Sequence, residues 1–134
     1  MKKLAVVLTI VGVCASLAAV GETARRRLEN PALGMIRHVV LFKFKDGTSE
    51  ADVKKITDAF AKLPDQIPEI ADFEWGTDNS PEGLAQGFTH CFLVTFKDAK
   101  ARDAYLPHPA HKAFVDILKP HLDKVLVVDY VATR

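Results

Sequence analysis

Cysteine is scarce in this chain, and its two cysteines cannot form a disulfide within the body of the protein. Cys14 lies inside an N-terminal apolar run, which leaves Cys91 as the single cysteine of the remaining sequence. A small disulfide-stapled fold is therefore excluded. The length of 134 residues and the apolar share of 49% are instead typical of one globular domain.

The chain also lacks an excess of charge of one sign. It carries 18 lysines and arginines against 17 aspartates and glutamates, for a formal net charge of +1. Without Lys2 and Lys3, the rest of the chain has 16 basic and 17 acidic residues. We therefore expect no nucleic-acid partner, because nucleic-acid-binding surfaces depend on an excess of basic residues. The sequence shows no internal repeat and no low-complexity tract.

Long apolar runs are missing except at residues 4–20, which follow Lys2 and Lys3 and end in small residues. We interpret residues 1–21 as a signal peptide, which predicts a periplasmic or secreted protein. An uncleaved membrane anchor is the first alternative, since 17 residues is the short end of a membrane span. A true start at Met35 is the second.

The remaining sequence predicts a polar linker followed by alternating strands and helices. Apolar residues with a period of two indicate strands, and apolar stripes bounded by Ser, Asp or Pro indicate helices. The linker is predicted over 22–34, strands over 36–44, 69–77, 88–97 and 122–131, and helices over 49–63, 99–105 and 109–118. Thr48 or Ser49 is the expected N-cap of the first helix, which should stop at Pro64, and Asp98 is the expected N-cap of the second.

The order β-α-β-β-αα-β is the split βαβ pattern of a ferredoxin-like α+β sheet with its helices on one face. We expect the first and third strands to be central, adjacent and parallel. His38 and His90 would then lie on the same face and at the same end of the sheet, because they occupy matching positions in those strands. Phe42 and Phe92 share that face, either as core residues or as pocket lining.

The segment 105–111, of sequence YLPHPAH, concentrates two imidazoles and a phenol between two prolines. Pro109 is a favoured first residue of a helix, so His108 is the expected N-cap and His111 lies in the first turn. The positive end of the helix dipole favours a neutral imidazole there, which can accept a proton. The topology would bring Tyr105 and these histidines toward His38. A capped helix start without function is the alternative interpretation.

At these residues the chain resembles the stress-responsive α/β-barrel family, known as Dabb. The likeness covers residues 35–132. It is carried by four segments of this sequence, which are 36–44 (IRHVVLFKF), 87–90 (GFTH), 105–111 (YLPHPAH) and 128–130 (VDY).

The resemblance implies a homodimer, in which two ferredoxin-like sheets pair into one α/β barrel. By similarity to the polyketide cyclases of this family, it also implies a cofactor-independent lyase that acts by proton abstraction, with His111 and Tyr105 as the catalytic residues. A small ligand with apolar and polar parts would be its substrate. The residues expected to line the pocket are His38, His90, His108, Phe42 and Phe92.

Two other functions fit the same residues. The pocket could bind a small molecule without turnover, or the protein could be a stress-protective homo-oligomer with the histidines as buried hydrogen-bonding groups. A metal site built from the four clustered histidines is a further alternative, since histidine favours zinc and copper. We predict a site without metal or cofactor.

Overall fold

The computed structural model describes residue 25 and residues 30–133. The chain divides into two compact units, residues 1–33 with residue 134, and residues 34–133. The predicted signal peptide, residues 1–21, and most of the predicted linker lie outside the described residues. In the first unit, the Asn30 side chain accepts a hydrogen bond from the Ala32 amide at 3.2 Å and so forms a turn. Among the described helices, none has the length and apolar character needed to cross a membrane.

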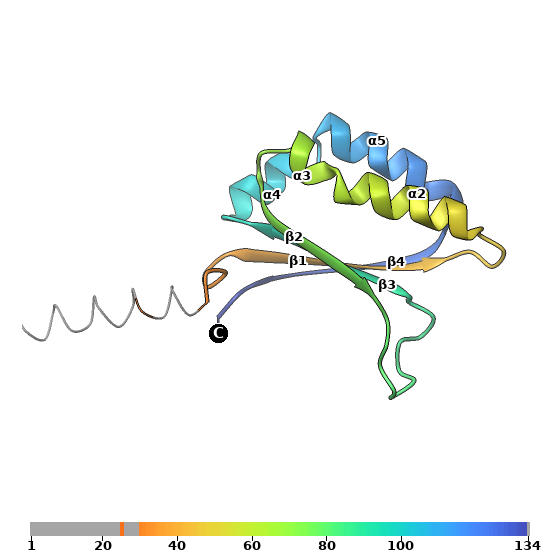
Figure 1. Ribbon diagram of the computed structural model, residues 1–134. Helices are drawn as coiled ribbons and strands as arrows, with labels where there is room; N and C mark the ends of the chain where they lie inside the picture. The colour runs from red at the N-terminus through yellow and green to blue at the C-terminus, as the bar shows by residue number, and fades with distance from the viewer. Residues whose placement is uncertain (1–24, 26–29, 134) are drawn as a thin grey trace, which may run out of the picture. The chain divides into compact units, whose positions relative to one another are not determined.

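The second unit is a ferredoxin-like α+β fold, in which one layer of helices covers one face of a four-stranded sheet (Figure 1). The predicted order of strands and helices is confirmed. The elements are β1 (Ile36–Phe44), α2 (Glu50–Ala61), α3 (Leu63–Gln66), β2 (Ile70–Thr77), β3 (His90–Phe96), α4 (Ala99–Tyr105), α5 (Pro109–Leu118), the 3-10 turn η1 (Lys119–His121) and β4 (Leu122–Val131).

The sheet has the strand order β2-β3-β1-β4, and every neighbouring pair is antiparallel. The expectation that the first and third strands run parallel is therefore wrong. The crossover through α2 makes β2 run in the same direction as β1, and the hairpin connection reverses the chain into β3. Because β3 inserts between the other two strands, it must run opposite to both. The start of β1 consequently lies beside the end of β3.

Local sequence signals fix the ends of most helices. Ser49 caps α2 by accepting a hydrogen bond from the Asp52 amide at 3.1 Å, and Asp98 caps α4 by accepting from the Ala101 amide at 2.9 Å. The predicted helix end at Pro64 is displaced. Pro64 instead lies in the first turn of α3, where its missing N–H costs no hydrogen bond.

The core lies between the sheet and the helices and is rich in phenylalanine. Phe92 of β3 lies 4.9 Å from Phe42 of β1 and 4.5 Å from Phe60 of α2, measured between ring centroids. Phe114 of α5 lies 4.5 Å from Phe60 and so joins the two main helices. Stacked and tilted rings at these separations add to the free energy gained by burial. The contacts explain why both helices lie on the same face of the sheet.

The opposite face of the sheet carries no helix and is largely apolar. Val39 pairs with Leu93, and Leu41 pairs with both Cys91 and Leu126. In Figure 1, the connection between β2 and β3 extends past the sheet on this side. A hollow of about 480 Å³ lies between that connection and the sheet, lined in part by Leu41 and Leu126. We call this helix-free side the outer face.

Candidate functional site

The segment 105–111 folds into a tight corner between α4 and α5. Tyr105 is the last residue of α4, and its carbonyl accepts a hydrogen bond from the His108 amide at 3.0 Å. His108 is the N-cap of α5, as predicted, and its Nδ1 accepts from the Ala110 amide at 3.2 Å. Pro109 begins α5. Because Nδ1 of His108 is an acceptor, the neutral ring carries its proton on Nε2.

The same corner turns His111 back toward the end of α4. Nδ1 of His111 lies 2.9 Å from the Leu106 carbonyl oxygen, which can only accept. Nδ1 therefore carries the proton, and the neutral ring presents a lone pair at Nε2. Burial lowers the pKa of His111 from its usual value, against the opposing effect of the Leu106 carbonyl, and the nearby His38 and His108 lower it further. His111 is thus a neutral imidazole with a free acceptor nitrogen at neutral pH.

Tyr105 lies directly beside His111 and is completely buried. The centroids of the two rings are 4.3 Å apart. Burial raises the pKa of Tyr105 far above its usual value, so the phenol stays protonated and can donate a hydrogen bond. Its hydroxyl makes no hydrogen bond to another residue in the described part of the chain. The phenol is therefore a buried donor that the other described residues leave unpaired.

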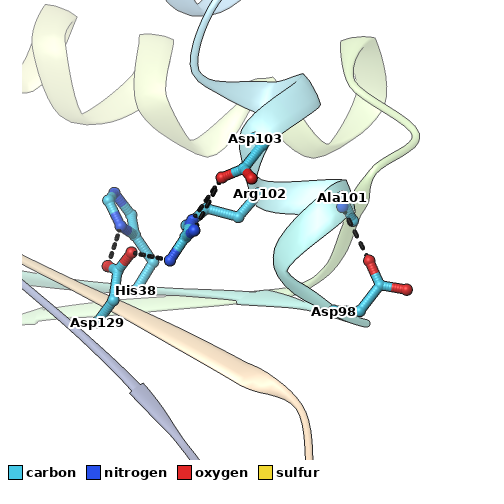
Figure 2. A network of polar contacts seen from close by, with 6 residues as sticks. All are labelled: His38, Asp98, Ala101, Arg102, Asp103 and Asp129. Carbon is cyan, nitrogen blue, oxygen red and sulfur yellow. Dashed lines mark hydrogen bonds and ion pairs between the residues drawn. The ribbon is translucent and has the colours of Figure 1, made fainter.

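His38 completes the cluster from the sheet side. It is buried in β1, and its ring centroid lies 5.9 Å from Tyr105 and 6.0 Å from Phe96, both in edge-on geometry. Its Nδ1 lies 2.6 Å from Oδ1 of Asp129 in β4. Figure 2 shows the ring standing up from its strand, with its second nitrogen directed away from the sheet. The structure therefore brings together three of the predicted site residues, His38, Tyr105 and His111.

Two charged residues that the sequence analysis did not assign to the site extend this cluster. Oδ2 of Asp129 accepts a hydrogen bond from Nη1 of Arg102 at 3.0 Å, and Arg102 also donates to Asp103 at 2.8 and 3.0 Å (Figure 2). Alternation in the last strand places Asp129 on the inward face with apolar residues. An acidic residue among apolar ones is a signal that could have marked Asp129 as a residue with a polar partner, but not which partner. No comparable signal marks Arg102.

His90 does not join the cluster, which corrects the prediction that it would lie beside His38. His38 pairs with Val94, whereas His90 pairs with Phe42, so the two histidines are four residues apart along the paired strands. This separation corresponds to roughly 13 Å. The expected match in position assumed parallel strands, and the antiparallel register reverses it. His90 instead stacks on the exposed Trp75, with ring centroids 6.2 Å apart.

Phe42 and Phe92 lie in the packed core. Their exposed fractions are 1% and 0%, and both contact Phe60. Neither ring is accessible to solvent, and their ring contacts are with other core aromatics such as Phe60. Of the two roles that the sequence left open for them, the structure thus places them in the core.

The histidines of the predicted site do not form a metal site in the described part of the chain. Across residue 25 and residues 30–133, no three His, Cys, Asp or Glu side chains are grouped so that they could hold a metal ion. Nδ1 of His38, His108 and His111 is already hydrogen-bonded within the protein.

Comparison with known proteins places this arrangement in a family. Residues 36–132 match the Stress responsive A/B Barrel Domain, or Dabb. A stress-response A/B barrel domain-containing protein of Arabidopsis thaliana, HS1, is 43% identical over 102 residues, which cover 76% of this chain and 94% of that protein. Olivetolic acid cyclase of Cannabis sativa is 33% identical over 99 residues, covering 74% of this chain and 98% of the cyclase.

Solved structures agree with this assignment. A hydroxynitrile lyase from Passiflora edulis superposes with a TM-score of 0.69 at 28% identity, covering 72% of this chain and 92% of the lyase. A dimeric ferredoxin-like protein of unknown function from Thermobifida fusca superposes with a TM-score of 0.62 at 32% identity, covering 73% of this chain and 92% of its own. The matched segment contains the whole cluster of His38, Tyr105, His111 and Asp129. By sequence and by fold, this chain belongs to the stress-responsive A/B barrel domain family.

Proposed function

We propose that this protein is a cofactor-independent lyase or cyclase that acts on a small molecule by proton abstraction. His111 is the general base, and Tyr105 donates a hydrogen bond to the oxygen on which negative charge develops. The observation that carries the proposal is the hydrogen bond from Nδ1 of His111 to the Leu106 carbonyl, which leaves Nε2 as a free acceptor beside the buried phenol.

The chemistry requires only proton movement. Nε2 of His111 takes a proton from a carbon next to a carbonyl group, and the electron pair of the broken C–H bond moves toward the carbonyl oxygen. The Tyr105 hydroxyl stabilises that oxygen by a hydrogen bond but keeps its own proton, because burial raises the pKa of Tyr105. The resulting carbanion attacks a second carbonyl to close a ring, and His111 returns the proton to the new alkoxide.

The relatives support this class of reaction. One similar protein is named as a cyclase and another as a lyase, although they share only part of their sequence with this chain. Both reactions can be started by removal of one proton without a cofactor. In the lyase direction, the base takes an O–H proton and the electron pair of that bond forms the carbonyl. The leaving group departs with the electron pair of the broken C–C bond and takes the proton back from the imidazolium.

The experiment uses two simple probes, a linear 1,3-diketone and an aromatic hydroxynitrile. Exchange of the diketone C–H in D₂O is followed by proton NMR, and hydroxynitrile cleavage is followed by cyanide release. We expect the wild-type protein to accelerate at least one reaction and His111→Ala to remove that acceleration. His121→Ala is the matched control, because His121 lies outside the cluster in η1. Equal rates with the wild-type protein and with His111→Ala would contradict the proposal.

A second candidate function is favoured by the burial of the cluster. Tyr105 has an exposed fraction of 0% and His38 of 5%, so these side chains also suit a purely structural role. A stress-protective homo-oligomer, or a module that binds a small molecule without turnover, would use the same residues as buried hydrogen-bonding groups. In that case the wild-type protein would accelerate neither probe reaction, and His111→Ala would only lower the free energy of unfolding.

We also propose that the N-terminal segment directs export, so that the mature protein is periplasmic or secreted. Lys2 and Lys3 before an apolar run support it. N-terminal sequencing of the native protein should give a start near Ala19 or Glu22. A start at Met35 would remove the export claim, and an intact Met1 in a membrane fraction would favour the anchor.

A further inference from the structure

We propose that Asp129 is a positioning residue that fixes His38 as a second proton acceptor of the site, so that the site works with two imidazoles. This inference rests on the proposed function, because it assigns a role in the same reaction. It also makes a claim about the free protein, the protonation pattern of the His38 ring, which is measurable without any substrate.

The geometry of His38 fixes its tautomer. An ionised carboxylate can only accept, so the contact of 2.6 Å between Nδ1 of His38 and Oδ1 of Asp129 requires a proton on Nδ1. Nε2 of the neutral ring then carries the lone pair. The ring is held between Phe96 and Tyr105, so rotation that would exchange the two nitrogens meets aromatic side chains on both sides.

Asp129 is itself held in place by a helix. Its second oxygen accepts from Nη1 of Arg102 at 3.0 Å, and Arg102 lies one helical turn before Tyr105 on α4. Arg102 therefore connects the helix that carries the phenol to the strand that carries the carboxylate (Figure 2). Both oxygens of Asp129 are engaged, one by His38 and one by Arg102. This leaves the carboxylate little freedom to turn away from the imidazole.

The two imidazoles approach Tyr105 from different layers of the fold. His111 comes from the helix layer and His38 from the sheet, and both carry their proton on Nδ1. In both rings Nε2 makes no hydrogen bond to another described residue, whereas a purely structural role would be best served by pairing both nitrogens. Two unpaired acceptor nitrogens on either side of one phenol are what a site with two proton acceptors requires. The expected substrate thus carries a hydroxyl or enol group in addition to the proton that His111 removes.

The added step is a reversible proton transfer. The substrate O–H bond breaks, its proton forms an N–H bond at Nε2 of His38, and its electron pair stays on oxygen. The positive charge of the imidazolium is balanced by the Asp129 carboxylate, to which Nδ1–H remains bonded. The proton returns to the product oxygen in the last step, so that no oxidant, metal or further reactant is consumed.

The test substitutes the carboxylate by an amide of the same shape. In Asp129→Asn, Arg102 still needs an acceptor, so the amide oxygen should face Arg102 and the NH₂ group should face His38. Nδ1 of His38 must then accept, and the ring proton must move to Nε2. Nitrogen-15 NMR of the imidazole ring distinguishes the two tautomers directly. We expect Nδ1–H in the wild-type protein and Nε2–H in Asp129→Asn.

Asp103→Asn is the matched control. It removes the other carboxylate partner of Arg102 while leaving the contact between Asp129 and His38 intact. The His38 tautomer should be unchanged in this variant. An inverted tautomer in both variants would overturn the proposal, because it would show a general electrostatic effect. An Nε2–H tautomer in the wild-type protein would overturn it as well, and this measurement holds even if Asp129→Asn fails to fold.

Kinetics separate this inference from the proposed function. With whichever probe the wild-type protein turns over, we expect Asp129→Asn to lower kcat by roughly 10²-fold, in the range of one general acid–base group. Asp103→Asn should keep the wild-type rate. If neither probe reacts but the tautomer inverts, the proposed function fails and the positioning by Asp129 stands. An unchanged kcat with an inverted tautomer would show that His38 accepts no proton in the reaction. The inference about Asp129 would then fail while the proposed function stands.

Discussion

At the scale of single residues, the chemistry of this site is decided by which group each imidazole touches. His111 donates to a carbonyl, His38 to a carboxylate, and His108 accepts from an amide. Three histidines of one protein are thus set in two tautomers by their neighbours. His38 and His111 present Nε2 as an acceptor, whereas the acceptor nitrogen of His108 is engaged in capping α5.

Substitution of the phenol tests the oxyanion role. Tyr105→Phe should reduce transition-state stabilisation by about 2–4 kcal/mol, because it deletes one donor to a developing charge. Since the Tyr105 hydroxyl makes no hydrogen bond to another described residue, the free energy of unfolding should change little. Steady-state kinetics and urea unfolding measure the two quantities. A large loss of stability with no loss of rate would assign Tyr105 to the core alone.

The lowered pKa of His111 predicts a dependence of stability on pH. Burial lowers the pKa in the folded state, so the unfolded chain binds a proton more readily than the folded protein does. The stability linked to His111 is therefore complete above the unfolded value of about 6.5 and is lost as the pH falls through the folded value.

NMR titration gives the direct measurement. The His111 resonance should titrate below the resonance of the same histidine in the urea-unfolded chain. His90, whose pKa is also lowered by burial, should behave in the same direction and must be assigned separately by substitution. A His111 pKa above 7 would contradict its assignment as a base.

At the scale of elements, the corner between α4 and α5 sets the position of the site. His108→Ala removes the side chain that caps α5, and the loss of such a cap costs about 0.5–2 kcal/mol. We expect a lower midpoint of urea unfolding together with a shift of the His111 ring resonances, because the first turn of α5 carries that residue. In His121→Ala, as the control, both should stay close to wild type. An unaltered midpoint in His108→Ala would show that the cap contributes nothing.

At the scale of the whole molecule, the outer face of the sheet requires a partner. Leu126 and Val128 are 39% and 49% exposed in the isolated chain, and large apolar patches on soluble proteins mark interaction sites. Structural neighbours of this chain are described as dimeric. We therefore predict a two-fold homodimer that buries this face, with the two sheets forming one barrel.

A charge on the outer face should break the dimer. Leu93 pairs with Val39 near the centre of that face, so Leu93→Lys would place an ammonium group in an apolar interface without a partner. Light scattering at micromolar concentration should show a dimer for the wild-type protein and a monomer for the variant. Lys55→Ala, on the exposed side of α2, is the control and should remain dimeric. A wild-type monomer, or a dimeric Leu93→Lys variant, would refute this assembly.

The sequence alone determined the elements of the fold and the local structure of the site. Apolar alternation located the strands, and Ser49, Asp98 and His108 marked helix starts that the structure confirms. These features depend on neighbours within about four residues, so they can be predicted without knowledge of the fold. The family followed from short segments of the same kind.

Only the tertiary structure decided which residues meet. The direction of β3 set the partner of each strand residue, and the antiparallel register separated His90 from the cluster that His38 joins. The contact of His38 with Asp129 spans 91 positions of the chain, and Arg102 reaches Asp129 across 27. Such pairs depend on strand order and register, which are fixed by the packing of the phenylalanine core between sheet and helices. Because that packing is a property of the folded chain as a whole, no local pattern around Asp129 or Arg102 could have revealed their shared role.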